Sequence, residues 1–297
     1  MKLREIGERE IVRDIIKKFS IPFDDCAFIS LDNFYLLLTT DMIYEETHFP
    51  KGARYYSIGW YSIAVNMSDI AAKGGEIIGF LVAIAMPKNF EKESLEEILN
   101  GMEDCMAKYG GKILGGDTKE ANKLTICISA IGKVRKEELM PRKGARVGEA
   151  LYVTGSIGKG AYLYKNEYDK LLQIKPRIKE ARTLAKERAS CCIDISDGLA
   201  SSLYQLKEVN GIGFRIYEDL LPIDNIAKKM EKPLEYALYH GGDYELLFTI
   251  SEEKGKMLEN KIDIKRIGEV IKEEKIVIVK NGKEKEVGNR GYEHFIS

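Results

Sequence analysis

The sequence predicts an α+β protein made of two domains. Predicted helices and strands alternate irregularly, and several strands occur as adjacent pairs, which favours α+β domains over one doubly wound parallel sheet. A charged stretch that holds Pro141, Gly144 and Gly148 separates two halves, and each half contains both kinds of element. With 297 residues, the chain is long enough for two domains that each bury a core. We therefore expect a first domain over residues 1–137 and a second over residues 138–297.

The first half opens with a helix and a hairpin. Apolar residues recur at helical spacing over residues 3–18, which indicates an amphipathic helix. The β-rich runs at residues 26–31 and 34–40 flank Asp32-Asn33, a pair typical of turns, so we expect a β-hairpin there.

Helices and strands also alternate through the rest of the first half. Residues 57–73 predict a helix that ends at Gly74-Gly75, and an apolar strand over residues 77–86 stops at Pro87. The remaining elements expected here are a helix at residues 95–109 and strands at residues 112–114 and 124–134.

The second half begins with a strand at residues 150–154 and a glycine-rich turn at residues 155–160. A strand at residues 191–195 leads directly into a helix at residues 199–209. The other elements expected are helices near residues 160–166 and 177–188 and strands near residues 214–217, 245–250, 265–270 and 276–279.

Composition excludes several classes of function. The chain is 44% hydrophobic with a net charge of -1. It therefore lacks the excess of basic residues that is typical of proteins that bind nucleic acid or an anionic membrane. The longest apolar stretch, Ile77 to Met86, is too short to span a bilayer. Residues 1–19 are charged throughout, unlike a secretory signal, and the five cysteines form no C-x-x-C pair. We expect a cytoplasmic protein with reduced cysteines.

Aspartates beside small or hydroxyl residues, often straight after an apolar run, are the most informative feature of the chain. Small neighbours leave space around a carboxylate, and hydroxyl groups add oxygen ligands. Oxygen ligands suit hard cations such as Mg²⁺, which proteins often bind together with substrate phosphates. The sequence therefore predicts several Asp-rich strand ends that converge on metal-bound polyphosphate. The segments are Asp24-Asp25-Cys26-Ala27, Thr39-Thr40-Asp41, Asn66-Met67-Ser68-Asp69, Gly115-Gly116-Asp117, Asp194-Ile195-Ser196-Asp197-Gly198 and Gly241-Gly242-Asp243.

Each aspartate also has a simpler explanation. A strand-end residue such as Asp41 commonly forms a turn or caps a helix. Asp194 and Asp197 flank a strand-to-helix turn, where Asp197 would make a good N-cap. Two carboxylates this close repel each other, however, unless a cation lies between them. The repetition of the pattern, more than any one site, favours metal binding.

The helix predicted at residues 57–73 carries polar residues among small and apolar neighbours. Asn66 and Asp69 are three residues apart and share one helix face, and Lys73 follows one turn later. This face is either solvated or buried, and the neighbours favour burial. A buried aspartate needs a partner, and a cation is a natural one.

Familiar catalytic motifs are missing from the sequence. The turn at residues 155–160 lacks the G-x-x-x-x-G-K-[ST] spacing of a P-loop, so we expect a turn that opens the second domain. No protein-kinase loop set, H-E-x-x-H motif or G-x-S-x-G motif is present. The three histidines are too scattered for a convincing zinc site.

Taken in order, nine segments resemble the thiamine-monophosphate kinases, from about residue 24 to the end of the chain. Several of these motifs are distinctive, and their order and spacing agree. The segments are Asp24-Asp25-Cys26-Ala27, Thr39-Thr40-Asp41, His48-Phe49, Ala64-Val65-Asn66-Met67-Ser68-Asp69, Gly115-Gly116-Asp117-Thr118, Tyr152-Val153-Thr154-Gly155, Ile193-Asp194-Ile195-Ser196-Asp197-Gly198-Leu199, Asp243-Tyr244-Glu245-Leu246 and Gly291-Tyr292-Glu293-His294-Phe295.

The resemblance implies two α+β domains of the aminoimidazole-ribonucleotide-synthetase-like type. The N-terminal domain, residues 1–137, would bind Mg-ATP and pair its sheet with that of a second copy in a homodimer barrel. The C-terminal domain, residues 138–297, would complete the ATP and substrate sites. The reaction implied converts ATP and thiamine monophosphate into ADP and thiamine diphosphate.

The resemblance also implies roles for individual residues. Several Mg²⁺ ions would be held by Asp25, Thr39, Thr40, Asp41, Asp69, Asp117, Asp194 and Asp197. ATP would contact Gly116, Asp117, Arg142 and Ser196. Thiamine monophosphate would contact His48 and Tyr292, with Asp243 as a further candidate.

The chemistry suits a chain rich in aspartate and poor in histidine. A phosphate monoester has a second pKa of about 6, so near pH 7 its oxygen is already ionised and nucleophilic. Metal ions and positioning can then neutralise and align two polyanions without a general base. We expect direct in-line transfer and no phosphoenzyme.

Two departures from the family pattern leave alternatives open. Phe23 stands where the family usually has glycine, and Gly242 stands where it has a substrate-contacting glutamate. Asp243 could shift into that role, His240 could compensate, or the substrate could differ. The alternatives are a superfamily relative that phosphorylates another small substrate and a non-catalytic dimer that senses ATP.

Overall fold

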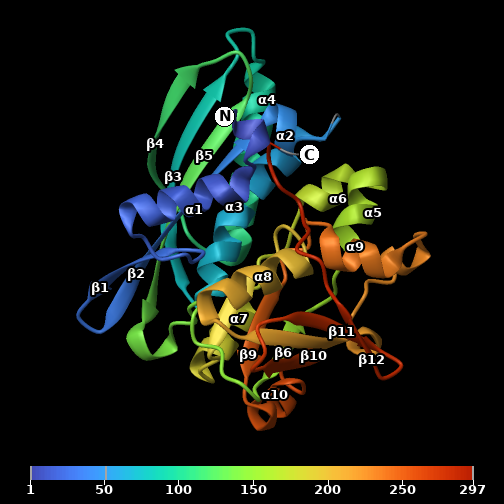
Figure 1. Cartoon of the computed structure of the whole chain (residues 1–297). Coiled ribbons are helices and arrows are strands. Elements are labelled where there is room, and N and C mark those ends of the chain that lie inside the picture. The colour runs from blue at the N-terminus through green and yellow to red at the C-terminus, as the bar shows by residue number, and fades with distance from the viewer. Residues whose placement is uncertain (1, 51, 296–297) are drawn as a thin grey trace. The chain divides into compact units, whose positions relative to one another are not determined.

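The computed structural model describes residues 2–50 and 52–295 (Figure 1). The chain divides into two compact units, each built around one β-sheet, which confirms the predicted α+β class. The five-stranded unit comprises Asp25–Met140 and Tyr162–Arg188. The seven-stranded unit comprises Met1–Asp24, Pro141–Ala161 and Ala189–Ser297. The functional roles expected for residues 1–137 and 138–297 stay a prediction.

The five-stranded unit has the strand order β1-β2-β5-β3-β4. Neighbouring strands are antiparallel except β3 and β4, which are parallel. Helix α3 (Tyr55–Ala72) packs on β2, β3 and β5, and α4 (Lys92–Tyr109) packs on α3. The strands are β1 (Ala27–Leu31), β2 (Phe34–Tyr44), β3 (Glu76–Met86), β4 (Ile113–Glu120) and β5 (Thr125–Arg135).

Helices α3 and α4 approach each other closely through two glycines. A Cβ atom on Gly59 would lie 1.9 Å from the carbonyl oxygen of Ile98, and one on Gly101 would lie 1.9 Å from that of Tyr56. A side chain at either position would therefore force the helices apart. Because α3 carries the polar face noted in the sequence, this contact also fixes where those side chains lie.

The predicted hairpin is confirmed, but the predicted fourth strand is too short. Leu31 pairs with Phe34 across the two-residue turn. The strand expected at residues 112–114 extends from Ile113 to Glu120 and pairs with β3 in parallel, so the Gly-Gly-Asp segment lies inside a strand. Glycine and aspartate have low strand propensity, and neighbouring β3 overrides it here.

The seven-stranded unit has the strand order β12-β11-β8-β10-β6-β9-β7. Only β8 and β11 are parallel neighbours. Its core joins strand residues such as Val153 and Leu247 to Leu203 of α8 (Leu199–Asn210). The strands are β6 (Ala150–Thr154), β7 (Cys191–Asp194), β8 (Gly213–Tyr217), β9 (Leu246–Ile250), β10 (Ile264–Ile271), β11 (Ile276–Lys280) and β12 (Lys283–Glu286).

Several short helices escaped prediction because they span too few turns to show a period. They are α2 (Glu45–His48), α6 (Tyr168–Leu172), α9 (Pro233–Tyr239) and α10 (Glu252–Leu258). The remaining α-helices are α1 (Glu8–Phe19), α5 (Lys159–Asn166) and α7 (Ile178–Lys186). Short 3₁₀ helices lie at Leu3–Glu5, Lys136–Glu138, Glu218–Leu220 and Ala227–Lys229. In residues 2–50 and 52–295, no helix is both long and apolar enough to cross a membrane.

Candidate active site

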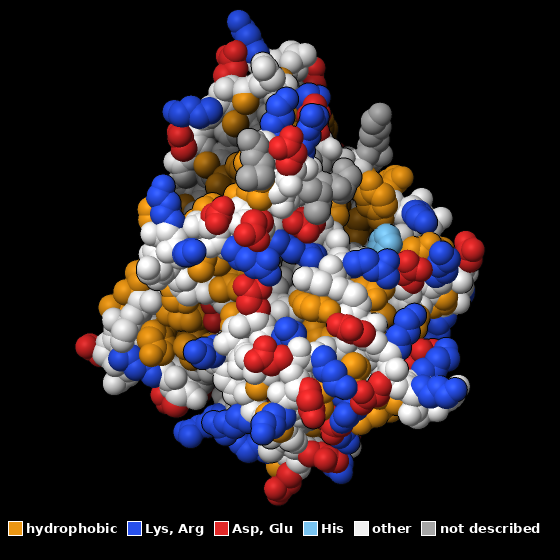
Figure 2. All heavy atoms as spheres, viewed as in Figure 1, with side chains coloured by type: hydrophobic (Ala, Val, Ile, Leu, Met, Phe, Trp, Pro, Cys, Tyr) orange, Lys and Arg blue, Asp and Glu red, His pale blue; other side chains and the backbone are white. Residues whose placement is uncertain are grey.

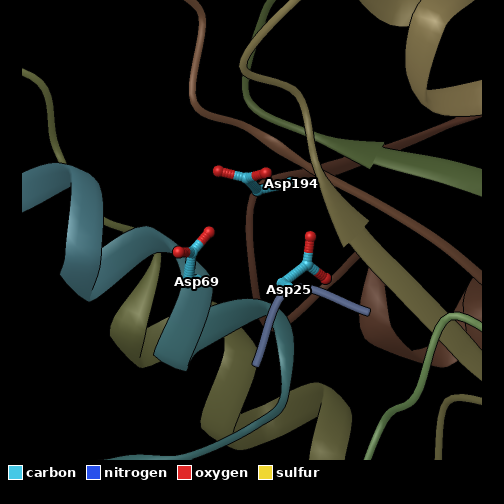
Figure 3. A group of neighbouring side chains, drawn as sticks. All are labelled: Asp25, Asp69 and Asp194. Atoms are coloured by element: carbon cyan, nitrogen blue, oxygen red, sulfur yellow. The ribbon is translucent and has the colours of Figure 1, made fainter. Parts of the chain in front are cut away.

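Two predicted metal ligands lie side by side in the five-stranded unit. A carboxylate oxygen of Asp25, just before β1, lies within 4.8 Å of one of Asp69 on α3 (Figure 3). Thr39 on β2 donates a hydrogen bond of 2.6 Å from Oγ1 to Asp69 Oδ2. Packing of α3 on β2 thus brings together three residues that the sequence singled out. Below, Asp25, Thr39, Asp69 and Lys73 are called the carboxylate cluster.

Lys73 is the cationic member of the carboxylate cluster. Its Nζ lies 2.7 Å from Asp25 Oδ2, and the two side chains are 0% and 1% exposed. The sequence placed Lys73 one helical turn after Asp69 but gave no sign of its partner. A buried carboxylate and a buried ammonium group require such a pairing, because either charge alone would be costly to desolvate.

The donor atoms around the carboxylate cluster fit a hard cation. Asn66, one turn before Asp69 on α3, is fully buried and donates from Nδ2 to the carbonyl oxygen of Ser62. Within the described part of the chain, its Oδ1 is a buried acceptor that has no hydrogen-bond partner. Amide, carboxylate and hydroxyl oxygens are the donors that Mg²⁺ prefers, and Asn66 lies on the same helix face as Asp69.

The side chains of the Thr-Thr-Asp segment lie on two different faces of the sheet, because the segment is part of strand β2. Asp41 lies two residues after Thr39, so it projects from the same face of the sheet, and burial raises the pKa of its carboxyl to about 6. Thr40 projects from the other face, where its Oγ1 donates to the carbonyl oxygen of Ile128 and accepts from Ser129 Oγ. The structure therefore brings Thr39, but not the hydroxyl of Thr40, to the carboxylate cluster.

Gly116 and Asp117 lie on the edge strand β4. A Cβ atom on Gly116 would come within 1.8 Å of the carbonyl oxygen of Val82, so only glycine fits there. Asp117 is exposed, and its Oδ1 accepts from the backbone N–H of Thr118 while Oδ2 lies 3.3 Å from Lys119 Nζ. These two interactions lower the pKa of the Asp117 carboxyl. Asp117 is not part of the carboxylate cluster.

His48 ends the short helix α2 in the same unit. Its Nδ1 lies 3.2 Å from the backbone N–H of Tyr44, which donates to it, and 2.7 Å from Thr47 Oγ1. These contacts hold Nδ1 close to the backbone and so fix the direction of the ring.

The seven-stranded unit brings three predicted segments together. Asp194, also drawn in Figure 3, ends β7 and is 5% exposed. The loop after it receives two backbone hydrogen bonds: Gly242 N–H donates to the carbonyl of Ser196, and Tyr292 N–H donates to that of Asp197. A Cβ atom on Gly241 would lie 2.3 Å from Ser196 O, so the loops pack directly on each other.

Tyr292 borders two cavities in this unit and is 43% exposed. One cavity of about 170 Å³ also contacts Asp197, and a second of about 480 Å³ also contacts His240. Arg9 of α1 lines both cavities and forms an ion pair of 3.3 Å with Glu293. Sequence reasoning missed Arg9, because one arginine in an amphipathic helix carries no distinguishing signal.

Asp243 holds the glycine-rich turn at residues 155–160. It is 2% exposed, and its two carboxylate oxygens accept hydrogen bonds from the backbone N–H groups of Gly158 (2.6 Å) and Gly160 (3.1 Å). Close by, the carboxylate of Glu245 binds Lys159 Nζ and Thr154 Oγ1, each at 2.7 Å. Any effect of Asp243 on a substrate would therefore pass through this turn.

Arg142 explains the first departure from the family pattern. Its guanidinium lies over the ring of Phe23, 4.9 Å from the ring centroid, and its Nη1 donates to Gln205 Oε1 at 2.7 Å. Its backbone N–H donates to Asp24 Oδ2. An aromatic ring at position 23 thus supplies a cation–π contact that glycine could not, and it helps to orient the guanidinium.

Two domain families match the chain in order. Residues 23–134 match the N-terminal domain of AIR synthase related proteins, and residues 146–281 match the C-terminal domain. The fold and the site thus define an AIR synthase related protein.

Individual relatives show to which family of AIR synthase related proteins the chain belongs. The thiamine-monophosphate kinase of Methanospirillum hungatei is 37% identical over 288 residues, which cover 96% of this chain and 97% of that protein. The thiamine-monophosphate kinase of Pyrococcus horikoshii is 31% identical and covers 99% and 97% of the two chains. The solved structure of AaThiL complexed with AMPPCP and TMP has a TM-score of 0.90 at 30% identity, with 99% of each chain covered. The chain belongs to the thiamine-monophosphate kinase family, which confirms the resemblance of its motifs.

The pKa of Asp243 leads to a pH-dependent prediction. Burial raises the pKa of this carboxyl from 3.8 to about 6. The Asp243 carboxyl therefore binds its proton more tightly in the folded than in the unfolded state. This contribution to stability is complete below about pH 4 and is lost as the pH rises through 6. Asp243→Asn removes this titration. The difference between the free energies of unfolding of the wild type and the variant should be about 2–3 kcal/mol larger at pH 4 than at pH 7.

Urea unfolding of both proteins at pH 4, 5.5 and 7 measures this difference. Asp219→Asn, an exposed position in the same unit, is the control and should give a constant difference across the range. An Asp243→Asn difference that did not change with pH would contradict the assigned protonation.

Proposed function

We propose that this protein transfers the γ-phosphoryl group of ATP to thiamine monophosphate, with Mg²⁺ as cofactor, and releases ADP and thiamine diphosphate. The carboxylate cluster is the observation that carries the proposal, because a set of partly buried oxygen donors suits Mg²⁺ held jointly with phosphates. The AMPPCP and TMP bound in the similar AaThiL structure support the same pair of substrates.

The residues divide into three roles under this proposal. Mg²⁺ ions are held by Asp25, Thr39, Asp41, Asp69, Asp117, Asp194 and Asp197, whereas the hydroxyl of Thr40 lies on the other face of β2. ATP contacts Gly116, Asp117, Arg142 and Ser196, with Phe23 and Gln205 orienting Arg142. Thiamine monophosphate contacts His48 and Tyr292, and Asp243 acts through the turn that it holds.

The chemistry asked of these residues is positioning and charge neutralisation. A bound metal ion would neutralise charge on the phosphates. The acceptor phosphate of thiamine monophosphate is ionised near pH 7, so no side chain has to remove a proton from it. The chain therefore needs only to align the two phosphates, and we infer direct in-line transfer without a phosphoenzyme. We expect the reaction in the cytoplasm.

The substrate side of the site differs from the family pattern at Gly242. This residue has a φ of 93°, a backbone conformation that favours glycine over glutamate. The carboxylate of Asp243 binds the backbone of the turn at residues 155–160, whereas His240 lines the 480 Å³ cavity together with Tyr292. His240 is therefore the residue of this loop that we place on the substrate side. A different small substrate, or ATP sensing without catalysis, remains the alternative.

³¹P NMR of the protein with ATP, Mg²⁺ and thiamine monophosphate tests the proposal. New signals of thiamine diphosphate and ADP should appear together. Asp41→Ala and Asp194→Ala should each lower the rate by more than about 100-fold with the fold intact by circular dichroism, because each removes a metal ligand. Folded, ATP-binding wild type that never formed thiamine diphosphate would refute the substrate assignment, and wild-type rates in either variant would refute the metal site.

We also propose that the protein is a homodimer that pairs through the sheet of the five-stranded unit. The face of this sheet opposite α3 exposes apolar side chains on three strands: Ile29 (47%), Leu31 (40%), Met42 (64%) and Leu81 (44%). Hydrophobic side chains also gather over β1 and β2 in Figure 2. An exposed apolar sheet face is typical of a protein–protein interface, and a second copy of this face is apolar as well.

Light scattering after gel filtration tests the dimer. The wild type should have about twice the chain mass of 33.6 kDa. Met42→Lys with Leu81→Lys should give the monomer, because both charges would be buried at the interface. Leu99→Lys, at an exposed position of α4, should stay dimeric. A wild type of 33.6 kDa, or a dimeric double variant, would contradict the interface.

A further inference from the structure

Lys73 is a fully buried lysine in the middle of a cluster that is expected to bind divalent metal. Its side chain is 0% exposed and its Nζ lies 2.7 Å from Asp25 Oδ2. Lysine is almost never fully buried unless it is paired, so this ion pair accounts for its position. The pair places a cation of the protein itself on a carboxylate that also belongs to the proposed metal site.

The backbone holds Lys73 in a fixed place. Lys73 is the C-cap of α3, and its N–H donates to the carbonyl oxygen of Ile70. Gly74 follows with a φ of 70°, and a Cβ atom there would come within 2.6 Å of Ala185 Cβ. The end of the helix is thus packed tightly, and a cation near a helix C-terminus is favourable. The backbone of Lys73 is therefore held in place by this packing.

The charges of the carboxylate cluster show what Lys73 changes. Asp25 and Asp69, within 4.8 Å of each other, would repel if both were ionised with no cation nearby. The ammonium group lies on one oxygen of Asp25, and a carboxylate offers about four acceptor positions, so one carboxylate can contact both an ammonium group and a metal ion. A divalent cation bound there at about 2.1 Å would lie close to the ammonium group and be repelled by it.

We propose that Lys73 is a resident cation of the carboxylate cluster, which stabilises Asp25 without metal and weakens the binding of divalent metal at that carboxylate. The proposal rests on the proposed function only in taking the cluster as a metal site. Its consequence is that the cluster folds without metal, while the metal ion binds weakly enough to exchange when nucleotide arrives. Lys73 is a positioning residue, since it acts on the metal through Asp25.

Mn²⁺ titration followed by electron paramagnetic resonance, without nucleotide, tests the proposal on the whole chain. Lys73→Met keeps an unbranched side chain but removes the charge. It should lower the Mn²⁺ dissociation constant about tenfold or more, because the repulsion is gone. Lys73→Arg keeps the charge and should bind Mn²⁺ as the wild type does. Lys92→Met, at an exposed lysine of α4, is the matched control and should change nothing.

Thermal unfolding gives a second readout. In EDTA, Lys73→Met should lose about 5 °C or more in Tm, because Asp25 is left buried without its cation. Added Mg²⁺ should then raise the Tm of the variant more than that of the wild type. If Lys73→Met fails to fold, Lys73→Gln takes its place as a neutral but polar side chain, and the same tighter Mn²⁺ binding is expected.

Two results separate this inference from the proposed function. In the first, the wild type binds Mn²⁺ and phosphorylates thiamine monophosphate, but the neutral Lys73 variants have the same Mn²⁺ affinity as the wild type and the same rise in Tm with Mg²⁺. This result would overturn the role of Lys73 alone. Wild type that binds no Mn²⁺ and phosphorylates nothing would overturn both.

Discussion

The buried ion pair between Asp25 and Lys73 is the constraint on which the rest of the candidate site depends. It joins Asp25, two residues before β1, to the end of α3, so the start of the strand and the end of the helix are fixed relative to each other. Asp69 and Thr39 then meet across the same packing contact. The close approach of α3 and α4 through Gly59 and Gly101 keeps this helix in place. A site made of repelling carboxylates can persist only on such a rigid support.

Much of this arrangement follows from sequence patterns. The helical spacing of Asn66 and Asp69 predicted a shared and buried face on α3, and in the structure Asn66 is fully buried whereas Asp69 is partly buried. Strand alternation alone separates Thr39 from Thr40, because successive side chains of a strand point to opposite faces. The pairing of Lys73 with Asp25 could not be predicted, because the two residues are distant in sequence and nothing local marks either as the partner of the other.

Asp243 shows where pattern reasoning reaches its limit. In the sequence it looks like the other aspartates that follow glycine. In the structure its oxygens accept from two backbone N–H groups of a turn far away in the chain, so it supports a loop instead of facing open space. Both departures from the family pattern also have physical explanations. Phe23 stacks under Arg142, and the left-handed conformation of Gly242 disfavours a side chain there.

Phosphoryl transfer by charge neutralisation and alignment, with no protein nucleophile in between, is the central claim of the proposed function. The stereochemical course of the reaction tests this claim most directly. ATP whose γ-phosphorus is made chiral with the three oxygen isotopes is converted with thiamine monophosphate, and the configuration of the transferred phosphoryl group is determined. Direct in-line transfer predicts inversion at phosphorus, since one displacement occurs. Retention would require a second displacement through a phosphoenzyme and would contradict direct in-line transfer.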